Sequence, residues 1–168
     1  MALPDYFERN AQATASLIQG FDVSAPAALL GKEVVGIYVD KSVPGNVESS
    51  HAVDLTVRIL ARLYPTLAIV GAAGVSKAYL LSLGKLAQAI NPKVDLLGAP
   101  DTVTKLLVFG ASAFNGKSKA HERTWYLGSD DWVVKLSRKG PVGSGKSSNP
   151  LAAGAAAVRN LFAHLLDN

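Results

Sequence analysis

Hydrophobic residues in this chain alternate between short, compact runs and longer stretches with helical spacing. The compact runs predict strands at residues 32–39, 66–70, 93–97, 104–109 and 123–127. Two intervening stretches, one ending before Pro65 and one over residues 75–90, carry apolar residues at helical spacing and predict helices. Strands alternating with helices predict a Rossmann-like, three-layer α/β fold, in which a mostly parallel sheet has helices on both faces.

Turn-forming and capping residues set the limits of these elements. Ser49 or Ser50 is expected to cap the helix that ends before Pro65. Residues 128–131 (GSDD) are expected to form a turn, and residues 132–136 form either a last strand or a short helix. The chain is expected to be a single domain over residues 1–168, made of an N-terminal helical segment (1–30), an α/β core (32–136) and a closing alanine-rich helix (150–166).

The composition narrows the class of protein. The chain has 168 residues, of which 49% are hydrophobic and 18% charged, and this excludes disorder. Because no apolar run reaches membrane-spanning length and the N-terminus lacks a signal-peptide profile, we expect a cytoplasmic protein. There is no cysteine, and the three histidines lie far apart, so no thiolate chemistry, metal site or cofactor is expected.

The net charge of +4 comes partly from basic residues grouped at 117–123 and 135–146. These groups lack the interleaved aromatic residues that are typical of nucleic-acid binding, which we therefore do not expect. They predict either a solvated loop surface or a site for an acidic protein partner.

Residues 140–147 (GPVGSGKS) match the phosphate-binding pattern G-x-x-x-x-G-K-[ST]. On this basis Gly145, Lys146 and Ser147 are candidate nucleotide-binding residues. However, Pro150 lies where the helix of a P-loop would already have begun, and only one acidic residue remains downstream. The context favours a basic loop that leads into the closing helix.

Four residues elsewhere are candidates for catalysis. They are Ser49, Ser50, Ser129 and Asp130. A serine nucleophile needs a base and an orienting acid, and the sequence does not place such a pair beside any of the three serines. Helix capping and an ordinary turn are the competing explanations. Gly71–Gly74 (GAAG) stands where a dinucleotide fold has its phosphate loop, but G-x-G-x-x-G is absent and a tight turn is favoured.

The closing helix is the best candidate for an interface. Asn149 and Pro150 provide an N-cap and a first helical residue, so the helix begins there. Ala153, Gly154 and Ala157 give it little side-chain bulk, which lets it lie close against a sheet or another subunit.

Some of these segments resemble known families. Residues 149–166 (NPLAAGAAAVRNLFAHLL) resemble a helix near the end of the adenylation domain of ThiF/E1-type ubiquitin-activating enzymes. Residues 53–70 (VDLTVRILARLYPTLAIV) and 128–132 (GSDDW) resemble short bacterial proteins of the E2 ligase fold family C. Genes for those proteins accompany E1-like and peptidase genes in ubiquitin-like conjugation operons, some of which are linked to phage defence.

The resemblance implies a component of a bacterial ubiquitin-like conjugation pathway. Its expected partners are an E1/ThiF-like adenylating protein and a ubiquitin-like protein, in a homo- or hetero-oligomer. Without a cysteine or an E1 nucleotide loop, the chain is expected to be a nucleotide-free, E1-like partner. Two alternatives remain open, and with them the question of whether it is an enzyme. One is a serine acceptor that forms an oxyester, for which Ser147 and Ser148 are further candidates; the other is a nucleotide-binding enzyme.

Overall fold

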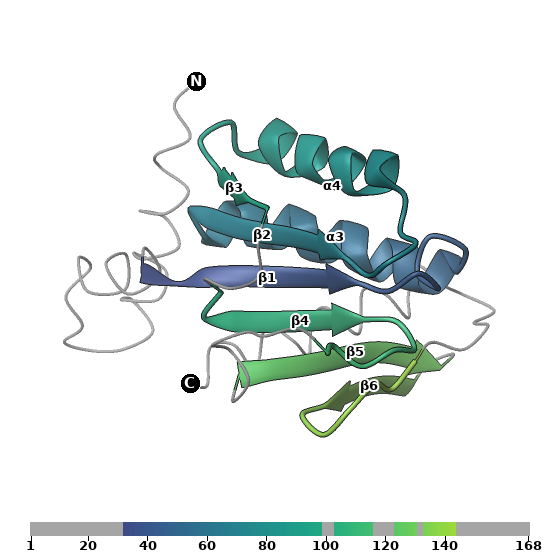
Figure 1. Cartoon of the computed structure of the whole chain (residues 1–168). Helices are drawn as coiled ribbons and strands as arrows, with labels where there is room; N and C mark the ends of the chain where they lie inside the picture. The colour runs from purple at the N-terminus through teal and green to yellow at the C-terminus, as the bar shows by residue number, and fades with distance from the viewer. Residues whose placement is uncertain (1–31, 99–102, 116–122, 131–132, 144–168) are drawn as a thin grey trace, which may run out of the picture.

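A computed structural model describes residues 32–98, 103–115, 123–130 and 133–143 (Figure 1). These residues form two helices and six strands. In chain order they are β1 (Val34–Val39), α3 (Val47–Leu63), β2 (Thr66–Gly71), α4 (Lys77–Ile90), β3 (Asp95–Leu97), β4 (Lys105–Phe109), β5 (Thr124–Asp130) and β6 (Val133–Ser137).

All six strands form one sheet, in the order β3-β2-β1-β4-β5-β6. Pairing is parallel from β3 through β5, and β6 is antiparallel to β5. This is the strand order of a dinucleotide-binding Rossmann fold, in which the chain direction across the sheet reverses between the first and fourth strands. The predicted Rossmann-like α/β class is confirmed.

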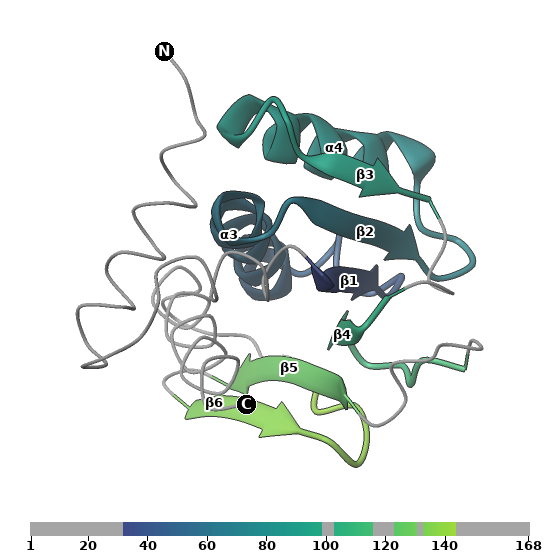
Figure 2. The same ribbon diagram turned by 90° about the vertical axis from the view of Figure 1, so that its left-hand side faces the viewer.

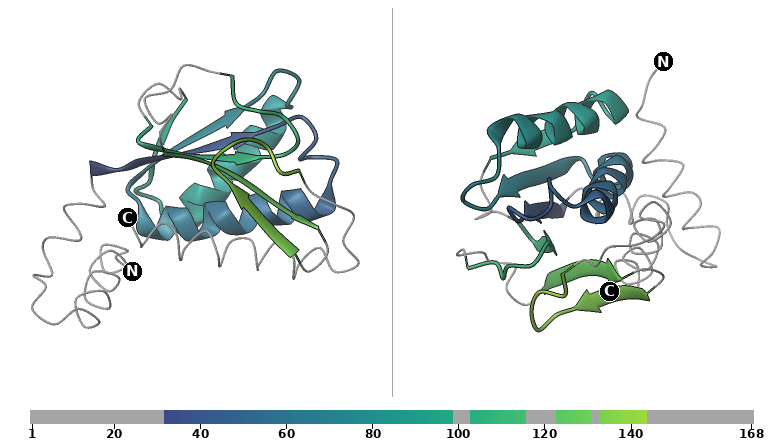
Figure 3. Two further views of the ribbon diagram at one scale, coloured as in Figure 1. Left: turned by 90° about the horizontal axis from the view of Figure 1, so that it is seen from below. Right: turned by 90° about the vertical axis from the view of Figure 1, so that its right-hand side faces the viewer.

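One face of the sheet packs against both described helices (Figures 2 and 3). Val35, Ile37 and Val39 of β1 point to this face and are fully buried. They join residues from α3, including Val57 and Leu60, in the larger of two hydrophobic clusters. Alternation of side chains along each strand explains why every second residue of β1 belongs to this core.

The other face of the sheet carries a second, smaller cluster. It is built on Ala68, Val103, Leu106 and Val108, and none of the described helices lies over it. Gly36 of β1 leaves room here, because a Cβ at this position would lie 2.9 Å from side-chain atoms of Leu106 and Val103. Loop residues therefore cover part of this face where a complete Rossmann fold has helices.

Two boundary predictions are wrong. Neither Ser49 nor Ser50 caps α3: the cap is Asn46, whose side chain accepts a hydrogen bond from the Ser49 amide. Residues 128–130 do not turn the chain but lie in β5. Of the two alternatives for residues 132–136 the strand is confirmed, since residues 133–137 form β6. Gly128 instead allows the backbone of Gly143 to approach β5 closely, because a Cβ at position 128 would lie 1.7 Å from the carbonyl oxygen of Gly143.

Candidate functional site

The carboxyl ends of β1 and β4 lie side by side at the point where the strand order reverses. In open α/β sheets, ligands bind in the crevice at this switch point. Asp40 follows β1 directly, and Gly110 and Ala111 follow β4. These residues therefore occupy the position at which a dinucleotide fold holds its phosphates.

The side chain of Asp40 fills this position. It is only 2% exposed. Its carboxylate accepts hydrogen bonds from the Lys41 amide at 2.6 Å, the Ser42 hydroxyl at 2.9 Å and the Ala111 amide at 3.0 Å. The Asp40 amide also donates to the carbonyl of Phe109 at 3.0 Å. The loop after β1 is thus tied to the loop after β4 through one residue.

These hydrogen bonds also control the ionisation of Asp40. Burial by itself raises the pKa of this carboxyl, but hydrogen bonds to the charged form outweigh it, so that the pKa lies below its ordinary value. The donors are Ser42, Lys41, Ala111 and Ser112. Asp40 is therefore a stable carboxylate at neutral pH.

Gly110 permits this close packing. Its φ of 112° lies in the region that favours glycine. A Cβ at this position would lie 2.5 Å from the Cβ of Asp40. The sharp exit from β4 and the seating of the Asp40 side chain therefore depend on the same residue.

The N-terminus of α3 is a second possible phosphate site, and side chains of this chain already occupy it. The Asn46 side chain accepts from the Ser49 amide at 2.9 Å, and the Asn46 carbonyl accepts from the Ser50 amide at 2.9 Å. Glu48 adds an acidic residue to the first turn and is 2% exposed. An acid at this end complements the helix dipole and opposes the binding of an external anion.

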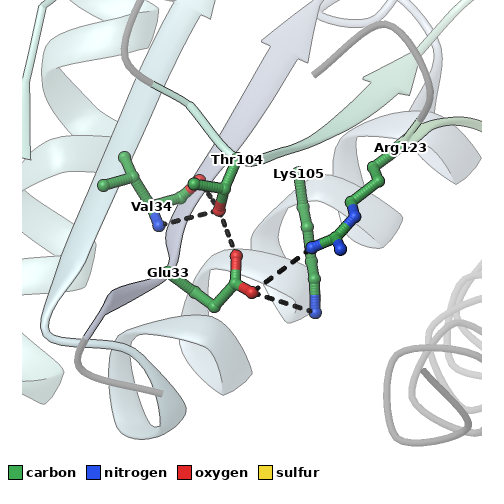
Figure 4. A network of polar contacts seen from close by, with 5 residues as sticks. All are labelled: Glu33, Val34, Thr104, Lys105 and Arg123. Atoms are coloured by element: carbon green, nitrogen blue, oxygen red, sulfur yellow. Dashed lines mark hydrogen bonds and ion pairs between the residues drawn. The ribbon is translucent and has the colours of Figure 1, made fainter. Parts of the chain in front are cut away.

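A second polar cluster lies at the opposite, amino-terminal ends of the same strands (Figure 4). Glu33, which precedes β1, accepts a hydrogen bond from the hydroxyl of Thr104. The same carboxylate lies 3.9 Å from the Lys105 ammonium and 3.5 Å from the Arg123 guanidinium. Thr104 also accepts a hydrogen bond from the Val34 amide at 3.1 Å. This cluster joins the starts of β1, β4 and β5.

The candidate catalytic residues do not meet at either cluster. Ser49 and Ser50 lie in the first turn of α3, where Ser49 is buried and the Ser50 hydroxyl donates to the carbonyl of Val43 at 2.9 Å. Ser129 and Asp130 lie at the end of β5. The other predicted site residues lie outside the described part of the chain. They are Gly145, Lys146, Ser147, Ser148, Asn149, Pro150, Ala153, Gly154 and Ala157.

The GAAG segment, whose first glycine is the last residue of β2, leads into a tight turn closed by a hydrogen bond from the Val75 amide to the Ala72 carbonyl at 3.1 Å. Across the described ranges, no three His, Asp or Glu side chains are arranged to hold a metal ion. Neither α3 nor α4 has the length and apolar character needed to cross a bilayer.

The sequence carries one signal for the switch point that pattern reasoning missed. An aspartate directly after the run VVGIYV marks the carboxyl end of a central strand, where Rossmann folds place functional groups. No comparable signal exists for Glu33 and Thr104, since their contact spans 71 positions in sequence.

The fold and site define a Rossmann-like domain whose phosphate position is filled by its own carboxylate. The chain matches the family model of prokaryotic E2 family C over residues 39–165, and it belongs to this family. Membership confirms the resemblance to the bacterial family C proteins.

The chain is also 38% identical, over 156 residues, to the uncharacterized protein y4jF of Sinorhizobium fredii (strain NBRC 101917 / NGR234). The match covers 93% of this chain but 29% of that protein, so this chain spans less than a third of the length of its relative.

Proposed function

We propose that this domain is a nucleotide-free, E1-like partner that binds an E1/ThiF-type adenylating enzyme in a ubiquitin-like conjugation pathway. The observation that carries the proposal is the seating of the Asp40 carboxylate at the switch point of the sheet. Its bonds to the Lys41 and Ala111 amides use donors that a nucleotide-binding loop would offer to a phosphate.

A phosphate entering this position would meet a buried negative charge. It would have to displace the carboxylate from its hydrogen-bond donors, three of which lie at 2.6 to 3.0 Å, and then lie beside it. Like charges at such short range repel strongly in a site shielded from water. The acidic first turn of α3 removes the neighbouring helix N-terminus as an alternative. This arrangement supports a structural rather than an adenylating role.

The absence of cysteine supports a partner role as well. A chain without cysteine cannot form the thioester that an E2 enzyme carries. The activated ubiquitin-like protein would therefore be held by another subunit, and this domain would bind beside it. The length of y4jF, in which the matching region is 29% of the chain, is consistent with a domain that works next to other units.

The test is co-expression with the E1-like and ubiquitin-like proteins encoded in the same operon, followed by size-exclusion chromatography. We expect a stable complex with the E1-like protein, and calorimetry should detect no binding of ATP with Mg²⁺ by the isolated chain. If no complex forms with or without the ubiquitin-like protein, the partner role is wrong. If ATP binds and Lys146→Ala abolishes it, the domain is a nucleotide-binding enzyme instead.

The same reagents test the serine acceptor. After incubation with the E1-like protein, ATP and the ubiquitin-like protein, intact mass should show no covalent adduct on this chain. An adduct that hydroxylamine cleaves, and that one Ser→Ala change removes, would establish the acceptor role.

The proposal also includes an antiviral setting, supported by the operons of the proteins it resembles. Deleting the gene should then increase phage plaque counts.

A further inference from the structure

Strand β6 forms one border of the sheet, because it pairs with β5 and stands last in the strand order (Figure 1). A border strand offers backbone hydrogen-bonding groups to an added strand. Its first residue, Val133, is 61% exposed, one of three large hydrophobic residues so exposed in the described ranges. Thus, within the described sheet, β6 combines an outer edge that has no paired strand with an exposed apolar side chain at its start.

The other end of β6 is basic. Arg138 and Lys139 directly follow the strand and are exposed. The Arg138 guanidinium lies 4.1 Å from the centre of the Trp125 ring, which holds it against β5. A guanidinium stacked in this way is fixed in place and still presents its N–H groups at its rim.

The described acidic residues do not neutralise this basic end. Asp40 and Glu48 are buried, and the carboxylates of Glu33 and Asp54 face other cations. Asp95 belongs to β3, at the opposite border of the sheet. Asp130 pairs with Val133, at the far end of the hairpin from Arg138. None of the described carboxylates is therefore placed against Arg138 or Lys139, and both side chains are exposed to a partner.

We propose that the outer edge of β6 binds an extended, acidic segment of a partner protein by strand addition. The segment would place an apolar residue against Val133 and acidic residues against Arg138 and Lys139. At about 3.3 Å per residue, these anchor points lie roughly 16 Å apart, which is about five residues of extended chain. Main-chain bonds would supply affinity, and the two ends would set register and charge preference.

This surface is separate from the switch point and does not depend on the proposed role of Asp40. Basic residues on an edge strand also discourage pairing with copies of the same chain. This basic edge would accept an acidic strand and would repel a basic one. The chain would thus select its partner by charge while avoiding self-association.

The test is fluorescence anisotropy with labelled peptides and the full chain. The probes are extended peptides of about ten residues. Each carries one valine and, about five positions away from it, a group of three glutamates. Two such peptides are used, one for each chain direction along β6. We expect one direction to bind with a Kd on the order of 10–100 μM, more weakly as salt is added. A peptide N-methylated on alternate amides should bind at least about tenfold more weakly, since strand addition needs those groups.

The matched variants reverse charge at two places. Arg138→Glu with Lys139→Glu should weaken binding at least about tenfold, whereas Lys77→Glu with Lys85→Glu, on the exposed side of α4, should change it less than about twofold. Because Arg138 packs on Trp125, Arg138→Gln with Lys139→Gln is a milder second variant. It should weaken binding in the same direction.

Four results would overturn the proposal. They are no saturable binding of either peptide, equal binding of the N-methylated peptide, equal loss in the α4 variant, and tighter binding of a single-stranded oligonucleotide of similar charge.

Discussion

Removing the Asp40 carboxylate tests the closed switch point most directly. The carboxylate accepts from the Lys41 amide, the Ser42 hydroxyl and the Ala111 amide. Each hydrogen bond to a charged group contributes about 1.5–3 kcal/mol net. The three share one acceptor group, and Lys41 and Ala111 are exposed residues whose amides can regain water. We therefore expect Asp40→Ala to lower the free energy of unfolding by about 2–4 kcal/mol, below the simple sum.

Urea unfolding measures this loss. Asp40→Asn keeps one acceptor oxygen and the side-chain shape, so it should cost about half as much as the alanine variant. Asp95→Ala is the matched control, because this aspartate is exposed on β3 and should cost less than about 0.5 kcal/mol. If Asp40→Ala is as stable as the control variant, the carboxylate does not hold the two loops together, and the reasoning fails.

The pH dependence follows from the lowered pKa of Asp40. A carboxyl with a lower pKa in the folded state binds its proton less tightly there than in the unfolded state. Its contribution to stability is complete above the ordinary pKa of about 3.9 and is lost as the pH falls through the folded value. The stability gap between wild type and Asp40→Asn should thus narrow below about pH 4. A constant gap down to about pH 2.5 would contradict the assigned direction.

Three further substitutions test other parts of the structure. Gly110→Ala should cost at least about 2 kcal/mol in urea unfolding, through its positive φ and its clash with Asp40, whereas Gly45→Ala, with open space around its Cβ, should cost little. Asn46→Ala should cost about 1 kcal/mol by removing the α3 cap, and Asn46→Asp should restore it; equal stability of all three proteins would exclude this cap. Glu33→Ala should cost about 1–2 kcal/mol, and that loss should change little with added salt, unlike the loss from an exposed ion pair.

Local patterns predicted most of the elements correctly. The run KLLVF is buried on both faces of the sheet, as a continuous apolar run in a central parallel strand should be. The predictions failed at residue types that occur in more than one kind of local structure. Serine is a common helix cap, but Asn46 lies nearer to the turn that starts α3 and takes that role. Glycine before two aspartates suggests a turn, but Gly128 makes room for the Gly143 peptide instead.

The contacts within the two polar clusters could not be predicted, because both clusters depend on one pairing between strands that are distant in sequence. β1 and β4 are the only neighbours in the described sheet that are not consecutive in the chain. No connecting helix or hairpin fixes their register, so side chains must do so. Glu33 and Thr104 join their amino ends, and Asp40 and Ala111 join their carboxyl ends.

A nucleotide-binding Rossmann domain must keep the carboxyl end of this same junction open for its ligand. Here the junction is bonded at both ends, and the carboxyl end is sealed by a buried charge. A junction closed by Asp40 and a junction open for phosphate exclude each other, because the amides that close it are those that would bind phosphate. Under the proposed partner role, the fold that usually positions a nucleotide would serve here as a support for the edges of the described sheet. A functional surface is better sought on those edges, of which β6 has both the apolar and the charged anchor.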